Sequence, residues 1–222
     1  MTHQRASRPP EPSQPYLRLS TFRPEIAPHE LDTWLRQAVS VYASQAGHIW
    51  TCVGRRAVGA TDEHAWASLW SSAEAHDRAF ESDPVMTVEQ EARTRVVGAM
   101  AELLPVRIKA IVPRARPMTI LRLFRGRTHP GQRDAYLAEA EVGAAEDGAR
   151  ADGPGAIACC TVGADEFVTA SVWVDWPSIE ACTGGDVHRP LTTRNAARIA
   201  AGGPTHFEIV AFESGVEALA TS

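Results

Sequence analysis

Hydrophobic and polar residues alternate along two stretches of the chain that share the tripeptide Leu-Arg-Leu. The stretches are residues 16–23 and 118–125, and the tripeptide lies at 17–19 and 121–123. Alternation with a period of two is typical of a β-strand that buries one face. The pattern therefore predicts a strand at both places, about a hundred residues apart.

A helix is predicted after each of these strands. In the first copy, apolar side chains recur after Pro28 at helical spacing and form one stripe: Leu31, Trp34, Leu35, Ala38, Val41 and Tyr42. Gly47 is predicted to end this segment. The corresponding helix, at about 130–148, is rich in alanine and has a less distinct stripe.

The remaining elements also occur twice. Hairpins are predicted at 48–56 with 63–70, and at 156–163 with 166–174. A short helix follows each hairpin, with Ser71 and Glu74 as a possible capping box in the first copy and Asp175 as the N-cap in the second. Final strands are predicted at 106–113 and 206–214.

The spacing between the matching residues is nearly constant. Trp70 is followed thirteen positions later by Asp83, and Trp173 is followed thirteen positions later by Asp186. Each aspartate is predicted to begin a turn. The order βαββαβ, written twice, predicts two ferredoxin-like units at 16–114 and 117–214 after a disordered tail at 1–15. Stacking the two bare sheet faces would bury them within one chain, so the predicted fold class is α+β, with the two units forming an intramolecular α+β barrel.

Residues 66–85, WASLWSSAEAHDRAFESDPV, resemble the dimeric α+β barrel superfamily. More narrowly, they are similar to the antibiotic biosynthesis monooxygenase family, whose domains carry a W-x-s-x-e-a-x-x-a-f-x-x-S run. The resemblance covers 16–114 well and 117–214 more loosely. The tandem form is similar to oxygenases of aromatic polyketide pathways, including those that open an angucycline ring.

This resemblance implies a monooxygenase that acts on an aromatic polyketide, such as a phenol, hydroquinone or anthrone-like ring system. It implies molecular oxygen and no bound cofactor, or reduced flavin (FMNH2 or FADH2) as a separate co-substrate. Because proteins of this fold catalyse many different reactions, other functions are also consistent with the sequence. They are a non-catalytic ligand-binding barrel, a cyclase or isomerase, and a haem-degrading relative.

The candidate catalytic residues are His48 and His64, because a histidine can take a phenolic proton near neutral pH. Strand alternation predicts that His64 shares a face with three candidate substrate-binding residues, Trp66, Ser68 and Trp70. It likewise predicts one shared face for His48, Trp50 and Cys52. Trp50 completes the candidate binding wall on the first hairpin.

The second hairpin presents Phe167, Thr169, Ser171 and Trp173 on the corresponding face, with Trp173 as a further substrate-binding candidate. The first copy is therefore predicted to be catalytic, and the second copy to be mainly scaffold. The competing interpretation is that these tryptophans and histidines are ordinary core residues.

Three other residues are candidates for chemistry. Arg18 and Arg122 occur at matching positions, which favours a structural role first and a contact to an anion or quinone oxygen second. In some haem-degrading proteins of the resembled superfamily a histidine on the second helix binds haem, but His188 is only two residues beyond Asp186, and the register for that role falls nearer Thr193.

Composition excludes several classes of protein. The net charge is −5 without a basic run, so nucleic acid is not an expected partner. No stretch of 18 or more apolar residues occurs, so no membrane-spanning segment and no membrane partner are expected. No metal-ligand spacing or nucleotide-binding motif occurs, so no bound metal is expected. The four cysteines form no C-x-x-C pair, which fits reduced thiols and a cytoplasmic location. The expected state is a monomer or homodimer that binds an aromatic small molecule.

Overall fold

The computed structural model describes residues 14–59 and 61–214, and its elements follow the predicted double order. We call β1–β4 with α1–α3 the first unit, and β5–β8 with α4, α5 and η1 the second unit. The first unit comprises β1 (Tyr16–Pro24), α1 (Pro28–Ala43), β2 (His48–Arg56), β3 (His64–Trp70), α2 (Ala73–Phe80), α3 (Asp83–Arg95) and β4 (Val96–Ile111). The second comprises β5 (Ile120–Thr128), α4 (Arg133–Ala149), β6 (Ala156–Thr161), β7 (Glu166–Trp173), α5 (Trp176–Thr183), the 3-10 helix η1 (Arg194–Arg198) and β8 (Ile199–Ser214).

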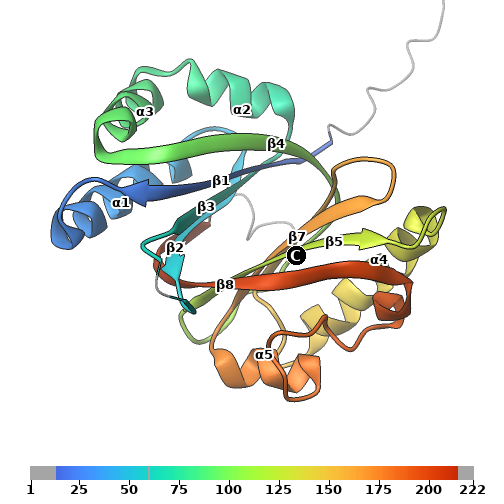
Figure 1. Cartoon of the computed structure of the whole chain (residues 1–222). Coiled ribbons are helices and arrows are strands. Elements are labelled where there is room, and N and C mark those ends of the chain that lie inside the picture. The colour runs from blue at the N-terminus through green and yellow to red at the C-terminus, as the bar shows by residue number, and fades with distance from the viewer. Residues whose placement is uncertain (1–13, 60, 215–222) are drawn as a thin grey trace, which may run out of the picture.

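All eight strands form one closed antiparallel barrel in the order β1-β3-β2-β8-β5-β7-β6-β4. Within each unit the strand order is the same, since β4-β1-β3-β2 corresponds to β8-β5-β7-β6. The units are joined twice, by β2 with β8 and by β4 with β6. Helices α1, α2 and α3 cover one side of the barrel, and α4 and α5 cover the opposite side (Figure 1).

The predicted α+β barrel of two βαββαβ units is confirmed, but the expectation of two separate sheets stacked face to face was wrong. Stacking alone would leave the backbone groups of four edge strands unpaired, and edge pairing satisfies them. Two long strands, β4 and β8, make this possible because each reaches from its own sheet to the other unit. The boundary predicted between 114 and 117 lies between β4 and β5, and the division into two domains stays a prediction.

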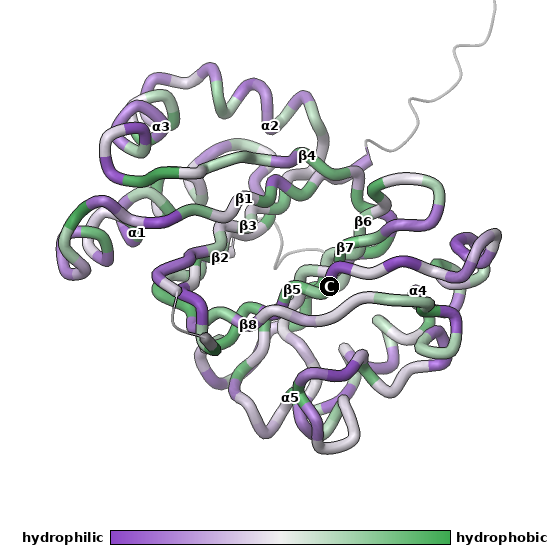
Figure 2. Tube along the Cα trace, viewed as in Figure 1, coloured by the Kyte–Doolittle hydropathy of each residue, from purple (hydrophilic) through white to green (hydrophobic). Residues whose placement is uncertain are grey.

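Apolar side chains form separate layers inside and outside the barrel. The interior cluster combines residues of both units, among them Leu17, Trp50, Leu121 and Phe207. Further clusters lie between the sheet and the helices of each unit. In Figure 2 the hydrophobic colour is frequent along β2, β3, β6 and β7, whereas the helices alternate between hydrophilic and hydrophobic colour.

The repeated tryptophan has the same local role in both units. The Trp70 indole Nε1 donates to Ser68 Oγ at 3.1 Å, and the Trp173 indole Nε1 donates to Ser171 Oγ at 2.9 Å. Both indoles are fully buried beneath helices. A hydrogen bond that satisfies the buried indole N–H explains why Ser-x-Trp ends both hairpins.

Several local predictions need correction. The N-cap of α2 is Ser72, which accepts from the Ala75 N–H, and not Ser71. Asp83 begins helix α3 and not a turn, with Pro84 in the first helical turn. Strands β4 and β8 begin at Val96 and Ile199, earlier than predicted. The cap predicted at Asp175 is confirmed, since its carboxylate accepts from the Ser178 N–H.

The predicted tail at 1–15 lies outside the described residues except for Gln14 and Pro15. Among the helices that the structure describes, none combines the length and apolar character needed to cross a membrane. Cys52, Cys159, Cys160 and Cys182 are free thiols, and all four are buried.

Candidate active site

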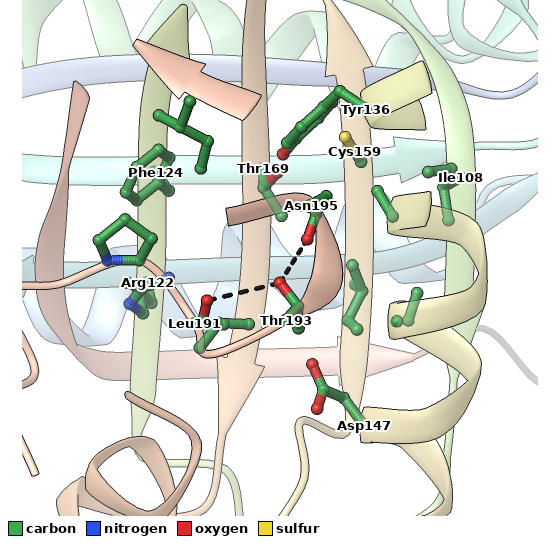
Figure 3. A pocket seen from close by; sticks show the side chains of 16 residues that line it. Ile108, Arg122, Phe124, Tyr136, Asp147, Cys159, Thr169, Leu191, Thr193 and Asn195 are labelled. Carbon is green, nitrogen blue, oxygen red and sulfur yellow. Dashed lines mark hydrogen bonds between the residues drawn. The ribbon is translucent and has the colours of Figure 1, made fainter. Parts of the chain in front are cut away.

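A cavity of about 70 Å³ lies mainly in the second unit, between helix α4 and the outer face of the sheet, to which β4 of the first unit contributes Ile108 (Figure 3). The segment between α5 and β8 covers its remaining side. The lining is mostly apolar, with a few polar groups. It consists of Ile108, Arg122, Phe124, Tyr136, Ala140, Gly143, Ala144, Asp147, Ile157, Cys159, Thr169, Pro190, Leu191, Thr193, Asn195 and Ile199.

The cavity exists because small residues stand where the first unit has large ones. On α4 the side facing the sheet carries Ala140, Gly143 and Ala144. On β7, Thr169 occupies the position that Trp66 occupies on β3, four residues before the repeated tryptophan. The alanine-rich, weakly striped character of this helix was the sequence signal for an incompletely filled space.

Arg122 projects from β5 into the cavity, on the side opposite α4 (Figure 3). The residue is only 2% exposed. One guanidinium Nη donates to the Arg189 backbone carbonyl at 2.6 Å, and its Nε is buried without a hydrogen-bond partner. The guanidinium carbon also lies 5.5 Å from the centre of the Phe124 ring. Burial lowers the pKa of Arg122 to about 10, so the side chain is still a cation at neutral pH.

Tyr136 projects from α4, and its hydroxyl points toward Thr169 and Cys159 (Figure 3). Burial raises the pKa of the Tyr136 phenol. Burial likewise raises the pKa of the Cys159 thiol to about 11. Both groups are therefore neutral near pH 7, and they provide weakly polar contacts without charge.

Asp147, from the last turns of α4, is the carboxylate of the cavity. It is 9% exposed, and burial raises its pKa. A carboxylate with a raised pKa is a stronger base than an ordinary aspartate, which suits it to proton removal. Across from it, the Thr193 hydroxyl donates to the Asn195 side-chain oxygen, which holds the covering segment together.

His206 on β8 is the cross-strand neighbour of Arg122 and is 3% exposed. Burial, with a further contribution from the Arg122 charge, lowers the pKa of His206 to about 4. The ring packs on Trp176, with ring centres 5.0 Å apart. His206 is therefore neutral at pH 7 and adds no charge next to Arg122.

The structure separates the residues that were predicted to share one face of β2. A bulge between His48 and Trp50 places Ile49 as an extra residue in the pairing with β3. Trp50 and Cys52 consequently lie inside the barrel, whereas His48 lies under the helices beside Trp70, with ring centres 5.3 Å apart. The predicted common face was wrong because the bulge inverts the alternation.

The predicted common face of β3 is confirmed, because Trp66 and Trp70 lie on the side of the sheet that faces the helices. Large side chains fill the space between this face and the helices. Trp66 is 5% exposed, and its ring centre lies 6.3 Å from that of Trp34 and 5.0 Å from that of Tyr42. Trp66 and Trp70 both belong to the core cluster beneath the helices of the first unit. These contacts support the core interpretation for the tryptophans.

The two candidate histidines are both buried in the first unit. His48 Nε2 lies 2.6 Å from Thr51 Oγ1, and His64 Nδ1 donates to the Asp62 carbonyl at 2.9 Å. Burial lowers the pKa of His48 to about 4 and also lowers that of His64, so both rings are neutral at pH 7. Their catalytic role stays a prediction, but neither contributes to the cavity described above.

The remaining candidates lie outside the cavity wall. Trp173 is fully buried against Ile179 and Cys182, and His188 is exposed. The position to which the haem-ligand register points is Thr193, which does line the cavity but is no haem ligand. Within residues 14–59 and 61–214, no three His, Cys, Asp or Glu side chains are grouped so as to hold a metal ion.

No family model matches this sequence, and no curated protein is significantly similar to it. The solved structures supply the comparison. A candidate monooxygenase from Fusobacterium nucleatum superposes with a TM-score of 0.75 at 9% identity, covering 91% of this chain and 95% of the other. A candidate monooxygenase from Lactobacillus acidophilus gives 0.74 at 9% identity, with 91% and 97% covered.

An anthrone oxidase-like protein also matches, with a TM-score of 0.55 at 13% identity over 95% of this chain and 97% of the other. At such identities the likeness establishes the fold alone. The chain is therefore an α+β barrel protein, and its chemistry has to be argued from its own cavity.

Proposed function

We propose that this chain is a monooxygenase that oxidises a phenolic aromatic compound, of the phenol, hydroquinone or anthrone kind, in the cavity of the second unit. The observation that carries the proposal is the pair of buried groups Arg122 and Asp147, a cation on the sheet wall and a carboxylate on the helix wall of one mostly apolar cavity. An apolar pocket with a few polar groups suits a flat aromatic ligand. Structures of like fold described as candidate monooxygenases or as anthrone oxidase-like add support.

In the proposed reaction, Asp147 takes the acidic proton of the substrate, and the resulting electron-rich ring reacts with molecular oxygen. A hydroperoxide forms at a ring carbon and loses water, which leaves a carbonyl there. One oxygen atom enters the product and the other leaves as water, so this oxidation needs no reductant. A hydroxylation that keeps the phenol would require two electrons, for which reduced flavin would be the separate co-substrate. The base was predicted to be a histidine, and Asp147 replaces it here because it lines the cavity.

The volume of the cavity limits what can bind in this conformation. About 70 Å³ is well below the roughly 300–1,000 Å³ of typical ligand pockets. A substrate of several rings therefore requires the segment that carries Pro190, Leu191 and Thr193 to move outward. We propose that this segment opens to admit the substrate and closes over it to exclude water.

Oxygen uptake with 1,8-dihydroxyanthrone, measured with an electrode and corrected for autoxidation, tests the function. We expect the wild-type protein to accelerate uptake and to form the anthraquinone. Thr169→Trp, which fills the cavity, is expected to lower the rate by about 10²-fold or more, because a reactant held out of position loses the advantage of proximity. Val162→Trp adds the same side chain at an exposed site of the same hairpin and is the matched control.

Two results would contradict the proposal. Uptake no faster than autoxidation would favour a non-catalytic ligand-binding barrel or a cyclase. Full activity of folded Thr169→Trp would place the reaction outside this cavity.

A further inference from the structure

Arg122 is a buried cation that no carboxylate neutralises within the described part of the chain. The only hydrogen bond of its side chain there goes to a neutral backbone carbonyl, that of Arg189. No salt bridge joins it to Asp147 on the other wall. The ring of Phe124 gives a partial compensation through a cation–π contact. A buried charge without a partner is costly, and such residues are retained mainly where they bind something.

The equivalent residue of the first unit shows what a structural arginine looks like in this fold. Arg18 occupies the matching position on β1, and its guanidinium lies 3.1 Å and 3.2 Å from the two carboxylate oxygens of Glu89 on α3. The Tyr42 hydroxyl donates to the same carboxylate. The second unit has no helix that corresponds to α3, so Arg122 has no such carboxylate.

The groups that face Arg122 from the neighbouring elements leave its charge uncompensated. They are His206 on β8, Tyr136 on α4, and the thiols of Cys159 on β6 and Cys182 on α5. The pKa of the histidine is lowered and those of the other three are raised, in each case chiefly by burial. All four are therefore neutral near pH 7, and His188 and Arg189 carry no negative charge. Among the described residues that line the cavity, Asp147 on α4 is the one anionic group, and it forms no ion pair with Arg122.

We propose that Arg122 binds the substrate as an anion, with a phenolate or enolate oxygen accepting hydrogen bonds from the guanidinium. This inference rests on the proposed function and specifies its substrate class, namely an acidic phenol or enol and not a neutral arene. The position of Asp147 on the opposite wall is consistent with it, because a proton removed there leaves the charge to be stabilised at Arg122. Arg122 then acts before oxygen reacts, by holding the electron-rich form of the ring.

Binding of 4-nitrophenol under anaerobic conditions tests this, because the phenolate of the dye absorbs visible light and the phenol does not. We expect the wild-type protein to bind the dye as phenolate, even below the dye's own pKa. Its methyl ether, 4-nitroanisole, cannot ionise and should bind at least roughly 10-fold more weakly. Arg122→Gln is expected to weaken binding of 4-nitrophenol by roughly 10- to 100-fold and to abolish the phenolate absorbance.

Arg122→Lys keeps the charge and should restore part of the phenolate signal, which a purely structural arginine would not do. Arg125→Gln, at an exposed position on the same strand, is the matched control, and circular dichroism verifies the fold of each variant. The proposal is overturned if the wild type binds neither compound, if it binds the ether as well as the phenol, or if folded Arg122→Gln retains the phenolate signal. Because the titration excludes oxygen, anion binding without oxygen uptake would reject the proposed function and leave this inference standing.

Discussion

The two units of the barrel place a Ser-x-Trp strand end and an arginine at matching positions, yet only the second has the cavity described here. In the first unit, Trp66 packs on Trp34 and Tyr42, and Arg18 is neutralised by Glu89. In the second unit, Thr169 stands in the place of Trp66, and Arg122 has no carboxylate partner among the residues that the structure describes. The comparison indicates that one unit serves stability, because its volume and charge are balanced internally. The other has an unfilled cavity and a buried arginine, the two features on which the proposed ligand site rests.

The largest expected effect is a loss of turnover when the candidate base of the second unit is replaced, compared with replacement of the candidate bases of the first unit. Asp147→Asn should lower turnover of 1,8-dihydroxyanthrone by about 10²–10⁴, since it removes the proposed general base. His48→Gln and His64→Gln should stay near the wild-type rate, because neither ring reaches the cavity. Steady-state oxygen uptake measures all three.

The pH profile of the same reaction gives an independent check. Asp147 is active as the carboxylate, so the wild-type rate should fall as the pH falls through its raised pKa. Asp147→Asn should lose this acidic limb. If instead the histidine variants lose the rate and Asp147→Asn does not, the base lies in the first unit and the sequence-based assignment of His48 and His64 is right.

Much of the fold could be predicted from the sequence because the period of the strands and the repeated spacings are local signals. The two hairpins and the cap at Asp175 depend on neighbouring residues, and they occur close to the predicted positions. The joining of the two sheets was missed because β4 and β8 extend through glycine-containing, weakly alternating segments at 96–105 and 199–205.

The candidate site was harder to predict because the cavity arises where large side chains are missing. Aromatic and histidine residues concentrated on the first hairpin suggested a binding wall, but α1 and α3 fill that space with side chains of their own. The bulge at Ile49 then moved Trp50 into the barrel. Tyr136 and Asp147 were missed, because the alanine-rich character of α4 indicates unfilled space, whereas only the packing shows that these two side chains border it.

The next effect concerns packing. Trp66→Thr gives the first unit the residue that opens the second and should cost about 3–5 kcal/mol of unfolding free energy, because a buried indole is lost and a cavity remains. Thr169→Val changes a side chain that already borders space and should cost less than about 1 kcal/mol. Urea denaturation measures both. A small loss of unfolding free energy for Trp66→Thr would mean that the first unit is not tightly packed around this indole. The proposed difference between a filled first unit and an unfilled second unit would then be wrong.

The smallest expected effect is on stability, and it compares the paired arginine of the first unit with the unpaired arginine of the second. Arg18→Met leaves the Glu89 carboxylate, which is about one-third exposed, without its cation, and we expect a loss of roughly 1–2 kcal/mol of unfolding free energy. Arg122→Met removes a buried cation that has no ionic partner and keeps an apolar side chain of similar length in its place. Replacing such a charge by an apolar group is often neutral or stabilising, so unfolding free energy should stay within about 1 kcal/mol of the wild type or rise. Denaturation of both variants at pH 7 without ligand decides the matter. If Arg122→Met loses as much stability as Arg18→Met, Arg122 is a structural residue like Arg18. The proposal that Arg122 is kept unpaired in order to bind an anion would then be wrong.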